Sequence, residues 1–131
     1  MVAYSFKARF VPLIREGLKT QAIRADRSRH ARPGELIQLF SGMRTHLCEK
    51  IVPDPVCTGV LPIVISFATA RIARVEVGMV PVRDLDAFAI SDGFEGLDDM
   101  TAFWLENHGA RGFDGVVIEW AMPRAAMRDV A

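Results

Sequence analysis

The residues best suited to chemistry are concentrated in the segment Gly17–Arg24, which carries a lysine, a threonine and an arginine within eight positions. Upstream, Val11, Ile14 and Leu18 recur at helical spacing, and the glycine that opens the segment is a natural helix stop. Polar side chains where a helix gives way to a strand lie on a rigid scaffold and point off its edge, where binding groups are commonly presented. The segment therefore predicts a binding or catalytic site.

Lys19 is the residue in this segment that suits acid–base chemistry. Burial and the neighbouring positive charge of Arg24 would both lower the pKa of its ammonium group and make it a proton acceptor. The alternative is a solvated lysine that interacts with the last carbonyl groups of the preceding helix. Both interpretations stay open at the level of the sequence.

A second polar segment, Asp92-Gly93-Phe94, precedes an expected helix. Glycine permits a positive φ and the close approach of a ligand. The Asp92 carboxylate could accept a hydrogen bond from the exocyclic amine of a base. Phe94 could stack on that base or fill the core, which is the commoner place for a phenylalanine.

The loop from position 24 to 32 is the strongly basic cluster of the chain. Four arginines against one aspartate give it a net charge of +3, and His30 lies within it: Arg24, Arg27, Arg29 and Arg32. Arginine holds phosphates bidentately and stacks on bases, so the cluster suits a nucleic acid. An exposed loop whose charge is balanced elsewhere is the alternative. Because the loop follows Lys19 directly, we expect both at one rim of the fold.

These motifs resemble those of a known family. Read as G-x-K-T-x-x-x-R, residues 17–24 resemble the signature of the ASCH domain family, small PUA-like barrels associated with RNA. Asp92-Gly93-Phe94, followed by a helix with Phe103 and Trp104, is similar to a second signature, and the segments between Phe6 and Trp120 come in a fitting order. The resemblance implies an α+β fold, a small PUA-like β-barrel with a few short helices packed around it. It implies one ASCH-like domain over residues 1–131, with a core at about 4–120 and a tail at 121–131.

Some ASCH proteins are amidohydrolases that remove the acetyl group from N4-acetylcytidine, and others are reported to cleave RNA. The resemblance implies a machinery of a motif lysine, a second motif threonine as nucleophile and a carboxylate before the second helix. Lys19 matches the lysine, and Asp92 matches the carboxylate, which is a glutamate in those enzymes. Ala22 stands where the threonine is common.

Two of these positions depart from the family's pattern. A methyl group at Ala22 cannot attack an amide carbonyl, so the covalent route fails there. Thr20 lies about 6–7 Å away along a strand and cannot simply substitute. Aspartate at position 92 also retracts the carboxylate by one methylene. Gly96 replaces an expected capping serine, which a helix start tolerates.

The elements that must position these residues follow from periodicity and turn signals. Strands are predicted over Tyr4–Phe10, Gln21–Arg24, Glu35–Phe40, Met43–Ile51, Val60–Phe67, Ala70–Val77 and Gly115–Trp120, and helices over Val11–Glu16, Asp84–Ser91 and Leu97–His108. Ser41-Gly42 is expected to form a hairpin turn, and Pro62 predicts that its strand starts at an edge or a bulge. Residues 122–131 predict a frayed tail or a short helix. The aromatic residues Phe103, Trp104, Phe113 and Trp120 are assigned to the core.

Composition bounds the remaining possibilities. A chain of 131 residues, half of them hydrophobic, is expected to fold as one domain. Sixteen basic and sixteen acidic side chains cancel, so binding to nucleic acid needs a local basic patch. No apolar run reaches the roughly 20 residues of a membrane span, and no signal-peptide core follows the start, which predicts a cytoplasmic protein without a membrane partner.

Cys48 and Cys57 are expected to be reduced core residues. His46 would share a strand face with Cys48, which makes three potential metal ligands, but a structural zinc site normally has four. We therefore expect no metal and no cofactor, although whether these three residues ever meet a metal stays open.

The leading hypothesis is a module that binds RNA or a modified nucleoside in a pocket at the barrel mouth. Lys19, Thr20, Arg24 and Asp92 would line the pocket with Gly93 and Phe94, and Arg27, Arg29 and Arg32 would guide phosphates. One alternative is a hydrolase, either an N4-acetylcytidine-type amidohydrolase or a ribonuclease, that uses Lys19 and Asp92 as catalytic residues. Another is a domain that acts on a protein partner.

Overall fold

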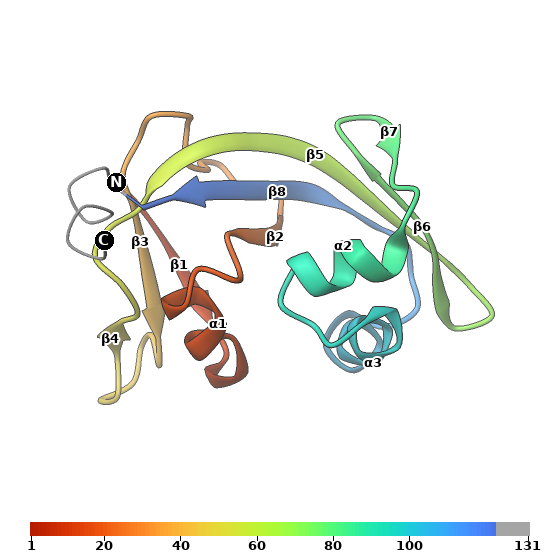
Figure 1. The fold of residues 1–131 in the computed structure, drawn as a ribbon, viewed down its shortest axis with the longest axis horizontal. Helices are drawn as coiled ribbons and strands as arrows, with labels where there is room; N and C mark the ends of the chain where they lie inside the picture. The colour runs from red at the N-terminus through yellow and green to blue at the C-terminus, as the bar shows by residue number, and fades with distance from the viewer. Residues whose placement is uncertain (123–131) are drawn as a thin grey trace. The chain divides into compact units, whose positions relative to one another are not determined.

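Helices and strands are mixed along the chain in the computed structural model, which describes residues 1–122 (Figure 1). In chain order the elements are β1 (Val2–Phe6), the 3-10 turn η1 (Ala8–Phe10), α1 (Val11–Arg15), β2 (Gln21–Ala25), β3 (Ile37–Ser41), β4 (Glu49–Lys50), β5 (Val56–Ala68), β6 (Arg71–Val77), β7 (Val80–Pro81), α2 (Leu85–Ser91), α3 (Leu97–His108) and β8 (Phe113–Ala121). The predicted α+β class is confirmed. The predicted tail lies, from residue 123 on, outside the described residues.

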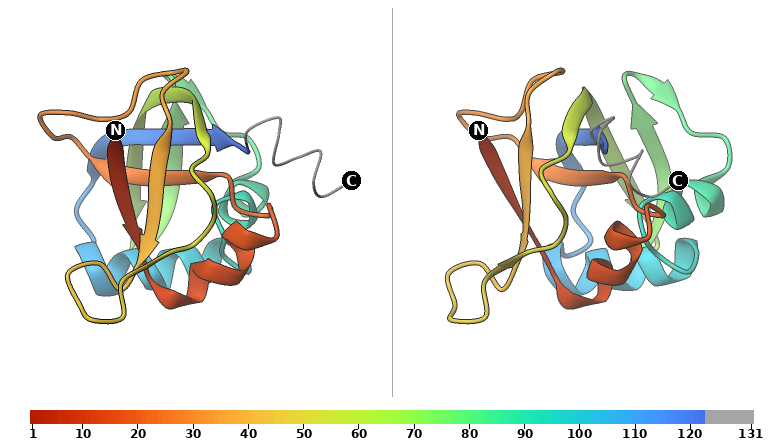
Figure 2. Two further views of the ribbon diagram at one scale, coloured as in Figure 1. Left: turned by 90° about the vertical axis from the view of Figure 1, so that its left-hand side faces the viewer. Right: turned by 60° about the vertical axis from the view of Figure 1, so that its left-hand side comes forward.

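The described strands form two sheets. One has three strands in the order β1-β3-β4, and the other has five in the order β2-β8-β5-β6-β7. β1 and β3 are parallel, with Val2 opposite Ile37, and Figure 2 shows the two strands side by side. Parallel neighbours need a long crossover. That crossover carries η1, α1, β2 and the basic loop, so it holds most of the residues singled out for chemistry.

The chain divides into two compact units. The first unit consists of Met1–Thr20, Arg27–Val60 and, as far as the structure describes it, residues 118–122. The second unit consists of Gln21–Asp26 and Leu61–Val117. The boundary falls inside β5 and inside β8, so each of these strands contributes residues to both units. The single ASCH-like domain over residues 1–131 stays a prediction.

The core of the first unit follows the period of its strands. Val2, Tyr4 and Phe6 are buried on β1, and Ile37 and Leu39 are buried on β3. Alternate residues of a strand point to one face, so both strands present an apolar face inward. A fully buried side chain of this size stabilises the fold by about 1.5–3 kcal/mol. This buried apolar face stabilises the pairing of β1 with β3, the two strands that the crossover connects.

The core of the second unit combines two strands with two helices. Ile63 and Ile65 of β5 and Ile72 of β6 are buried, as are Met100 and Trp104 of α3. The structure confirms the predicted helix over residues 97–108 at both ends and the predicted helix over α2. In Figure 1, α2 and α3 lie side by side.

Helix α3 begins without a capping side chain of its own. Gly96 is the N-cap, and the Leu97 N–H donates instead to Oδ1 of Asp86, on α2, at 2.9 Å. A β-carbon at Gly96 would lie 2.7 Å from that oxygen. The carboxylate of α2 therefore takes the place of the expected serine and is also well placed for the positive end of the α3 dipole.

The predicted strand Tyr4–Phe10 is wrong in its second half. β1 ends at Phe6, and residues Ala8–Phe10 form η1, closed by a hydrogen bond of 3.0 Å from the Phe10 N–H to the Lys7 carbonyl. The turn runs directly into α1, whose first turn contains a proline. Proline favours the first turn of a helix, which fits the start of α1 at Val11, and η1 replaces the last three residues of the predicted strand.

The predicted strand Met43–Ile51 is also wrong, except for β4. β3 and β4 do form an antiparallel hairpin, but residues 42–48 connect them, so the hairpin turn predicted at Ser41-Gly42 is wrong in its bounds. The Thr45 hydroxyl donates to the Gly42 carbonyl at 2.6 Å and accepts from the Leu47 N–H at 3.1 Å. Such local side-chain bonds compete with strand pairing.

Two smaller expectations are corrected by the same elements. Cys48 lies in the loop and is exposed, whereas Cys57 is buried; both are free, so only Cys57 is a core residue. Because His46 and Cys48 lie in this loop, they do not share a strand face. The strand predicted to begin at Val60 begins at Val56, and β5 lies between β8 and β6, so Pro62 does not mark an edge strand.

No helix among residues 1–122 combines the length and the apolar character that crossing a membrane requires.

The backbone conformation of the turn between β5 and β6 can be tested by substitution. Thr69 and Ala70 lie between paired residues Ala68 and Arg71 with φ of 52° and 55°, a two-residue hairpin in a conformation that favours Asn-Gly. Thr69→Asn combined with Ala70→Gly should raise the free energy of unfolding by about 1 kcal/mol, as measured by urea denaturation.

The turn between β6 and β7 supplies the matched control. Gly78 has φ of 58°, and a β-carbon there would meet Leu61 Cδ2 at 3.8 Å, an ordinary contact. Gly78→Ala should therefore lower stability through backbone strain alone. If Thr69→Asn combined with Ala70→Gly leaves the free energy of unfolding unchanged or lowers it, the positive φ angles of the turn between β5 and β6 are contradicted.

Candidate functional site

Two charged side chains are buried among residues 1–122. Lys19 is 3% exposed and Asp92 is 4% exposed. Charged groups are almost never buried this far without compensating interactions, because desolvation is costly. Lys19 belongs to the first unit and Asp92 to the second. These are the two residues that the sequence analysis singled out as catalytic.

Lys19 is positioned by the way α1 ends. Gly17 has φ of 76°; its N–H donates to the Ile14 carbonyl at 3.1 Å, and the Leu18 N–H donates to the Leu13 carbonyl at 2.9 Å. This pair of bonds is a Schellman motif, which ends a helix through a glycine in the left-handed conformation. The Lys19 N–H donates to the same Leu13 carbonyl at 3.1 Å, which fixes the backbone of the lysine against the end of the helix.

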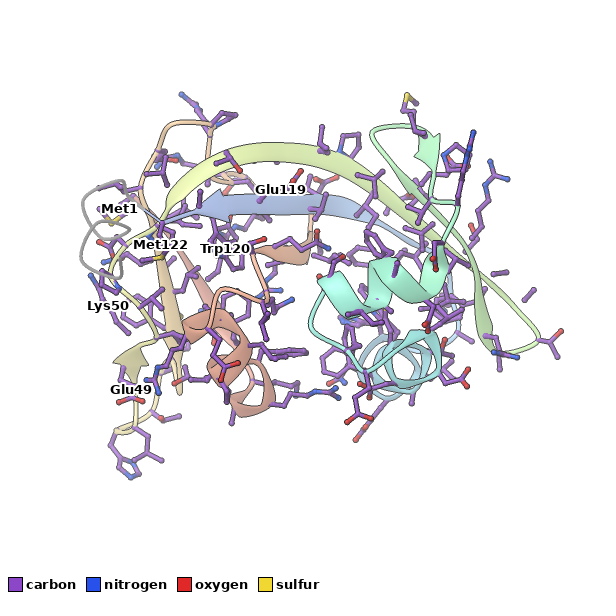
Figure 3. All side chains as sticks on the ribbon, in the orientation of Figure 1. Met1, Glu49, Lys50, Glu119, Trp120 and Met122 are labelled. Atoms are coloured by element: carbon purple, nitrogen blue, oxygen red, sulfur yellow. The ribbon has the colours of Figure 1, made fainter. Side chains whose placement is uncertain are left out.

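The ammonium group of Lys19 lies against aromatic rings of its own unit. Its Nζ is 4.9 Å from the centre of the Phe10 ring and 6.0 Å from the centre of the Phe6 ring. The face of an aromatic ring attracts a cation, and the attraction strengthens as water is excluded. Phe6 in turn packs edge-on against Trp120, labelled on β8 in Figure 3, with ring centres 5.9 Å apart. An aromatic cluster therefore compensates part of the cost of burying Lys19.

Thr20, a predicted ligand-binding residue, differs from its neighbour. Its side chain is exposed, while its carbonyl accepts a hydrogen bond of 3.0 Å from the Trp120 N–H. The backbone bond ties the end of the segment to β8, and the hydroxyl remains accessible.

Asp92 is positioned by a second Schellman motif. It is the C-cap of α2, and Gly93, with φ of 100°, donates its N–H to the Ile90 carbonyl at 3.0 Å. The Phe94 N–H donates to the Ala89 carbonyl, also at 3.0 Å. The segment Asp92-Gly93-Phe94 is thus the end of a helix, and its glycine meets the conformational requirement of that motif.

Gln21 is a polar partner of Asp92 that the sequence does not predict. Its Nε2 donates to Asp92 Oδ1 at 3.1 Å within the second unit, across 71 positions of sequence. A hydrogen bond to a carboxylate favours the charged form and compensates part of its desolvation. Gln21 occupies a variable position of the first signature, so nothing in the sequence points to this contact.

Phe94 is buried and packs against Phe103 of α3, with ring centres 5.2 Å apart. This contact is the core-filling role that the sequence analysis weighed against base stacking. Base stacking on Phe94 remains a prediction.

Arg24 and Ala22 lie on β2. Arg24 is half-buried, and its Nη1 donates to the adjacent Ile23 carbonyl at 2.9 Å. Ala22 has no exposed surface, so a threonine there would need space for two additional heavy atoms. The β2 backbone also runs close to β8, since a β-carbon at Gly115 would collide with the Arg24 carbonyl.

The basic loop is held to the first unit by Tyr4. The Tyr4 hydroxyl lies 3.0 Å from Nδ1 of His30 and accepts the Ala31 N–H at 3.1 Å. The Arg27 guanidinium lies 4.7 Å from the centre of the Tyr4 ring, and its Nε donates to the Arg29 carbonyl at 2.9 Å. The loop is therefore ordered through an aromatic ring while Arg27 stays exposed.

Glu35 partly balances the charge of this loop. Its carboxylate accepts a hydrogen bond from the Arg32 backbone N–H at 3.1 Å and pairs with the Arg29 guanidinium. The bond from Arg32 and the charge of Arg29 lower the pKa of Glu35, although partial desolvation opposes them. The side chains of Arg27, Arg29 and Arg32 are all exposed.

The predicted residues thus fall into two groups. The first unit holds Lys19, Thr20, Arg27, Arg29 and Arg32, and the second holds Arg24, Asp92, Gly93 and Phe94. Within the first unit, Lys19 and Arg27 lie over different aromatic rings. Within the second unit, the hydrogen bond from Gln21 to Asp92 is a contact that the sequence does not predict.

Metal binding was considered for His46, Cys48 and Cys57. No group of three His, Cys, Asp or Glu side chains among residues 1–122 is arranged to hold a metal ion. Burial raises the pKa of the Cys57 thiol, which disfavours the thiolate that a metal would require.

Comparison of the chain with protein-family models, with curated proteins and with solved structures gives no match.

The contact between Gln21 and Asp92 can be tested through stability. Gln21→Ala removes a donor from a buried carboxylate and should lower the free energy of unfolding by about 1–2 kcal/mol, as measured by urea denaturation. Thr20→Ala, the neighbouring exposed position, is the control and should change it by less than about 0.5 kcal/mol. Equal effects of the two substitutions would contradict a specific role of the amide.

Proposed function

We propose that the protein binds single-stranded RNA or a modified nucleoside, as an ASCH-like module built on a PUA-like barrel in the cytoplasm. The observation that carries the proposal is the burial of Lys19 and Asp92, one from each of the two signature segments. Buried ionisable residues are enriched at functional sites, because a fold gains little net stability from burying charge even where the charge has partners.

The chemistry of these residues suits a nucleoside. The Asp92 carboxylate accepts hydrogen bonds, and the Gln21 amide bonded to it carries a second N–H donor and a carbonyl acceptor, so the pair can address the edge of a base. The Lys19 ammonium can donate to a base carbonyl or a phosphate. The exposed arginines of the basic loop can hold phosphates, and Arg27 is already oriented by Tyr4.

Binding of a fluorescein-labelled 12-nucleotide RNA, followed by polarisation, tests this proposal. The natural protein should bind saturably, and affinity should fall as salt rises, because bound phosphates release counterions. Lys19→Met, which keeps the length of the side chain and removes its charge, should weaken binding at least tenfold, or about 1.4 kcal/mol.

The control for this test is Lys50→Met, which removes an exposed lysine that pairs with Asp54. It should change the affinity less than threefold. Thermal denaturation of both variants establishes that they are folded. Absence of saturable binding to a panel of RNAs and nucleosides would refute the proposal.

Hydrolysis is a second candidate function, favoured by the same burial of a potential proton acceptor, Lys19, and a carboxylate, Asp92. Since Ala22 excludes a threonine nucleophile, water would attack the acetyl carbon of N4-acetylcytidine directly. Lys19 in its neutral form would take the proton from water and return it to the departing cytidine amine, yielding acetate and cytidine.

Chromatography of N4-acetylcytidine incubated with the purified protein separates the two candidates. Under the binding proposal we expect no cytidine to form. Formation of cytidine that disappears in Lys19→Ala would instead establish a hydrolase that needs no threonine at position 22. Activity that arises only in Ala22→Thr would mean that the site is of the family type and lacks its nucleophile.

A further inference from the structure

The neutral charge of the chain conceals an unequal distribution between its two units. Among its described residues, the first unit carries nine lysines and arginines against five aspartates and glutamates, a net charge of +4. The second unit carries five basic side chains against ten acidic ones, a net charge of −5. An anionic ligand is therefore attracted by the first unit and repelled by the second.

Part of the positive charge of the first unit lies outside the basic loop. The stretch from position 7 to 19, which contains η1 and α1, carries four basic residues against one glutamate: Lys7, Arg9, Arg15 and Lys19 against Glu16. Lys7 and Arg9 are exposed on either side of the start of η1. We call Lys7 and Arg9 the η1 pair.

The η1 pair is joined to Lys19 through one aromatic ring. The Arg9 guanidinium carbon lies 5.2 Å from the centre of the Phe10 ring, and Lys19 Nζ lies 4.9 Å from the same centre. Two cations therefore share Phe10, one exposed and one buried. This arrangement orders the Arg9 head group, and it continues the positive charge from the buried lysine to the outside of the first unit.

Arg15 has a structural role in the first unit. Its Nε donates to the Ile51 carbonyl at 3.1 Å, and Nη2 pairs with Glu49 of β4, labelled in Figure 3, at 3.4 Å. The η1 pair is exposed and is linked to Lys19 through Phe10, and these two features favour it as a contact for a ligand.

The surface hollow of the second unit has the opposite character. It encloses about 450 Å³ and is lined by Arg71, Asp86, Glu95, Gly96, Leu97, Asp98 and Asp99. Four carboxylates against one arginine would repel a phosphate. This hollow is therefore unsuited to the backbone of a nucleic acid.

We infer that the ligand is an RNA strand rather than a free nucleoside, and that its phosphates contact the η1 pair as well as the basic loop. The inference rests on the proposed function and extends it to a ligand class and a surface. A free nucleoside has no phosphate, so neither the η1 pair nor the three loop arginines would have a partner on it. The basic loop leads into β3 opposite Val2, and η1 follows Phe6 at the other end of β1, so a strand of several phosphates that runs along β1 would engage both groups.

A charge-reversal experiment tests the inference. Lys7→Glu/Arg9→Glu and the control Arg83→Glu/Arg111→Glu change the net charge equally, and all four side chains are exposed. Polarisation with the labelled 12-nucleotide RNA should show at least tenfold weaker binding for the η1 variant and less than threefold weakening for the control. The slope of log affinity against log salt should also become shallower by about 1.4 for two lost phosphate contacts. Circular dichroism and thermal denaturation establish that both variants are folded.

The outcomes separate the inference from the proposed function. Weaker binding and a shallower salt slope for the η1 variant alone support the inference. Equal weakening by the two variants, or no weakening, overturns the assignment of the surface, although RNA binding itself stands. If N4-acetylcytidine or cytidine binds with the same affinity as the 12-nucleotide RNA, the inference that the ligand is an RNA strand is overturned. Failure of RNA and nucleosides alike overturns both proposals.

Discussion

The end of a short helix is the constraint on which both buried charges depend. Helices α1 and α2 each stop at a Schellman motif with a glycine in the left-handed region, Gly17 at φ 76° and Gly93 at φ 100°. The bonds of each motif fix the backbone of the glycine and of the residue after it, and a further bond from the Lys19 N–H to the Leu13 carbonyl fixes the lysine. Lys19 follows one glycine by two positions, and Asp92 precedes the other by one. A side chain at Gly17 would meet nothing within 4 Å, so the requirement there is purely one of backbone conformation.

Burial of charge is then made tolerable in two different ways. Lys19 lies against the faces of Phe10 and Phe6, which interact with a cation without neutralising it. Asp92 accepts a hydrogen bond from an uncharged amide, Gln21. Both side chains lie in places with little water, where an electrostatic interaction with a ligand would be strong. Hydrophobic residues of similar size would serve stability as well or better, and this is the ground for proposing a functional role for the two residues.

The accuracy of the sequence-based prediction varied with the range of the interactions involved. Helix α3 was predicted at both ends, because its apolar spacing and the glycines on either side of it act within a few residues. The strand predicted over Met43–Ile51 failed because the Thr45 hydroxyl bonds to nearby backbone groups, a competition that periodicity does not report. The bond between Gln21 and Asp92 spans 71 positions and follows from no local pattern.

The sequence by itself determined the α+β class, the helices α1, α2 and α3, the glycine stop at Gly17, and the choice of Lys19 and Asp92 as residues of interest. All of these depend on residue type and on spacing along the chain. Only the tertiary structure decided that both residues are buried, that Lys19 shares the Phe10 ring with Arg9, and that positive and negative charge are divided between the units. Burial and charge distribution are properties of the neighbours that folding supplies, and a local sequence pattern does not identify these neighbours.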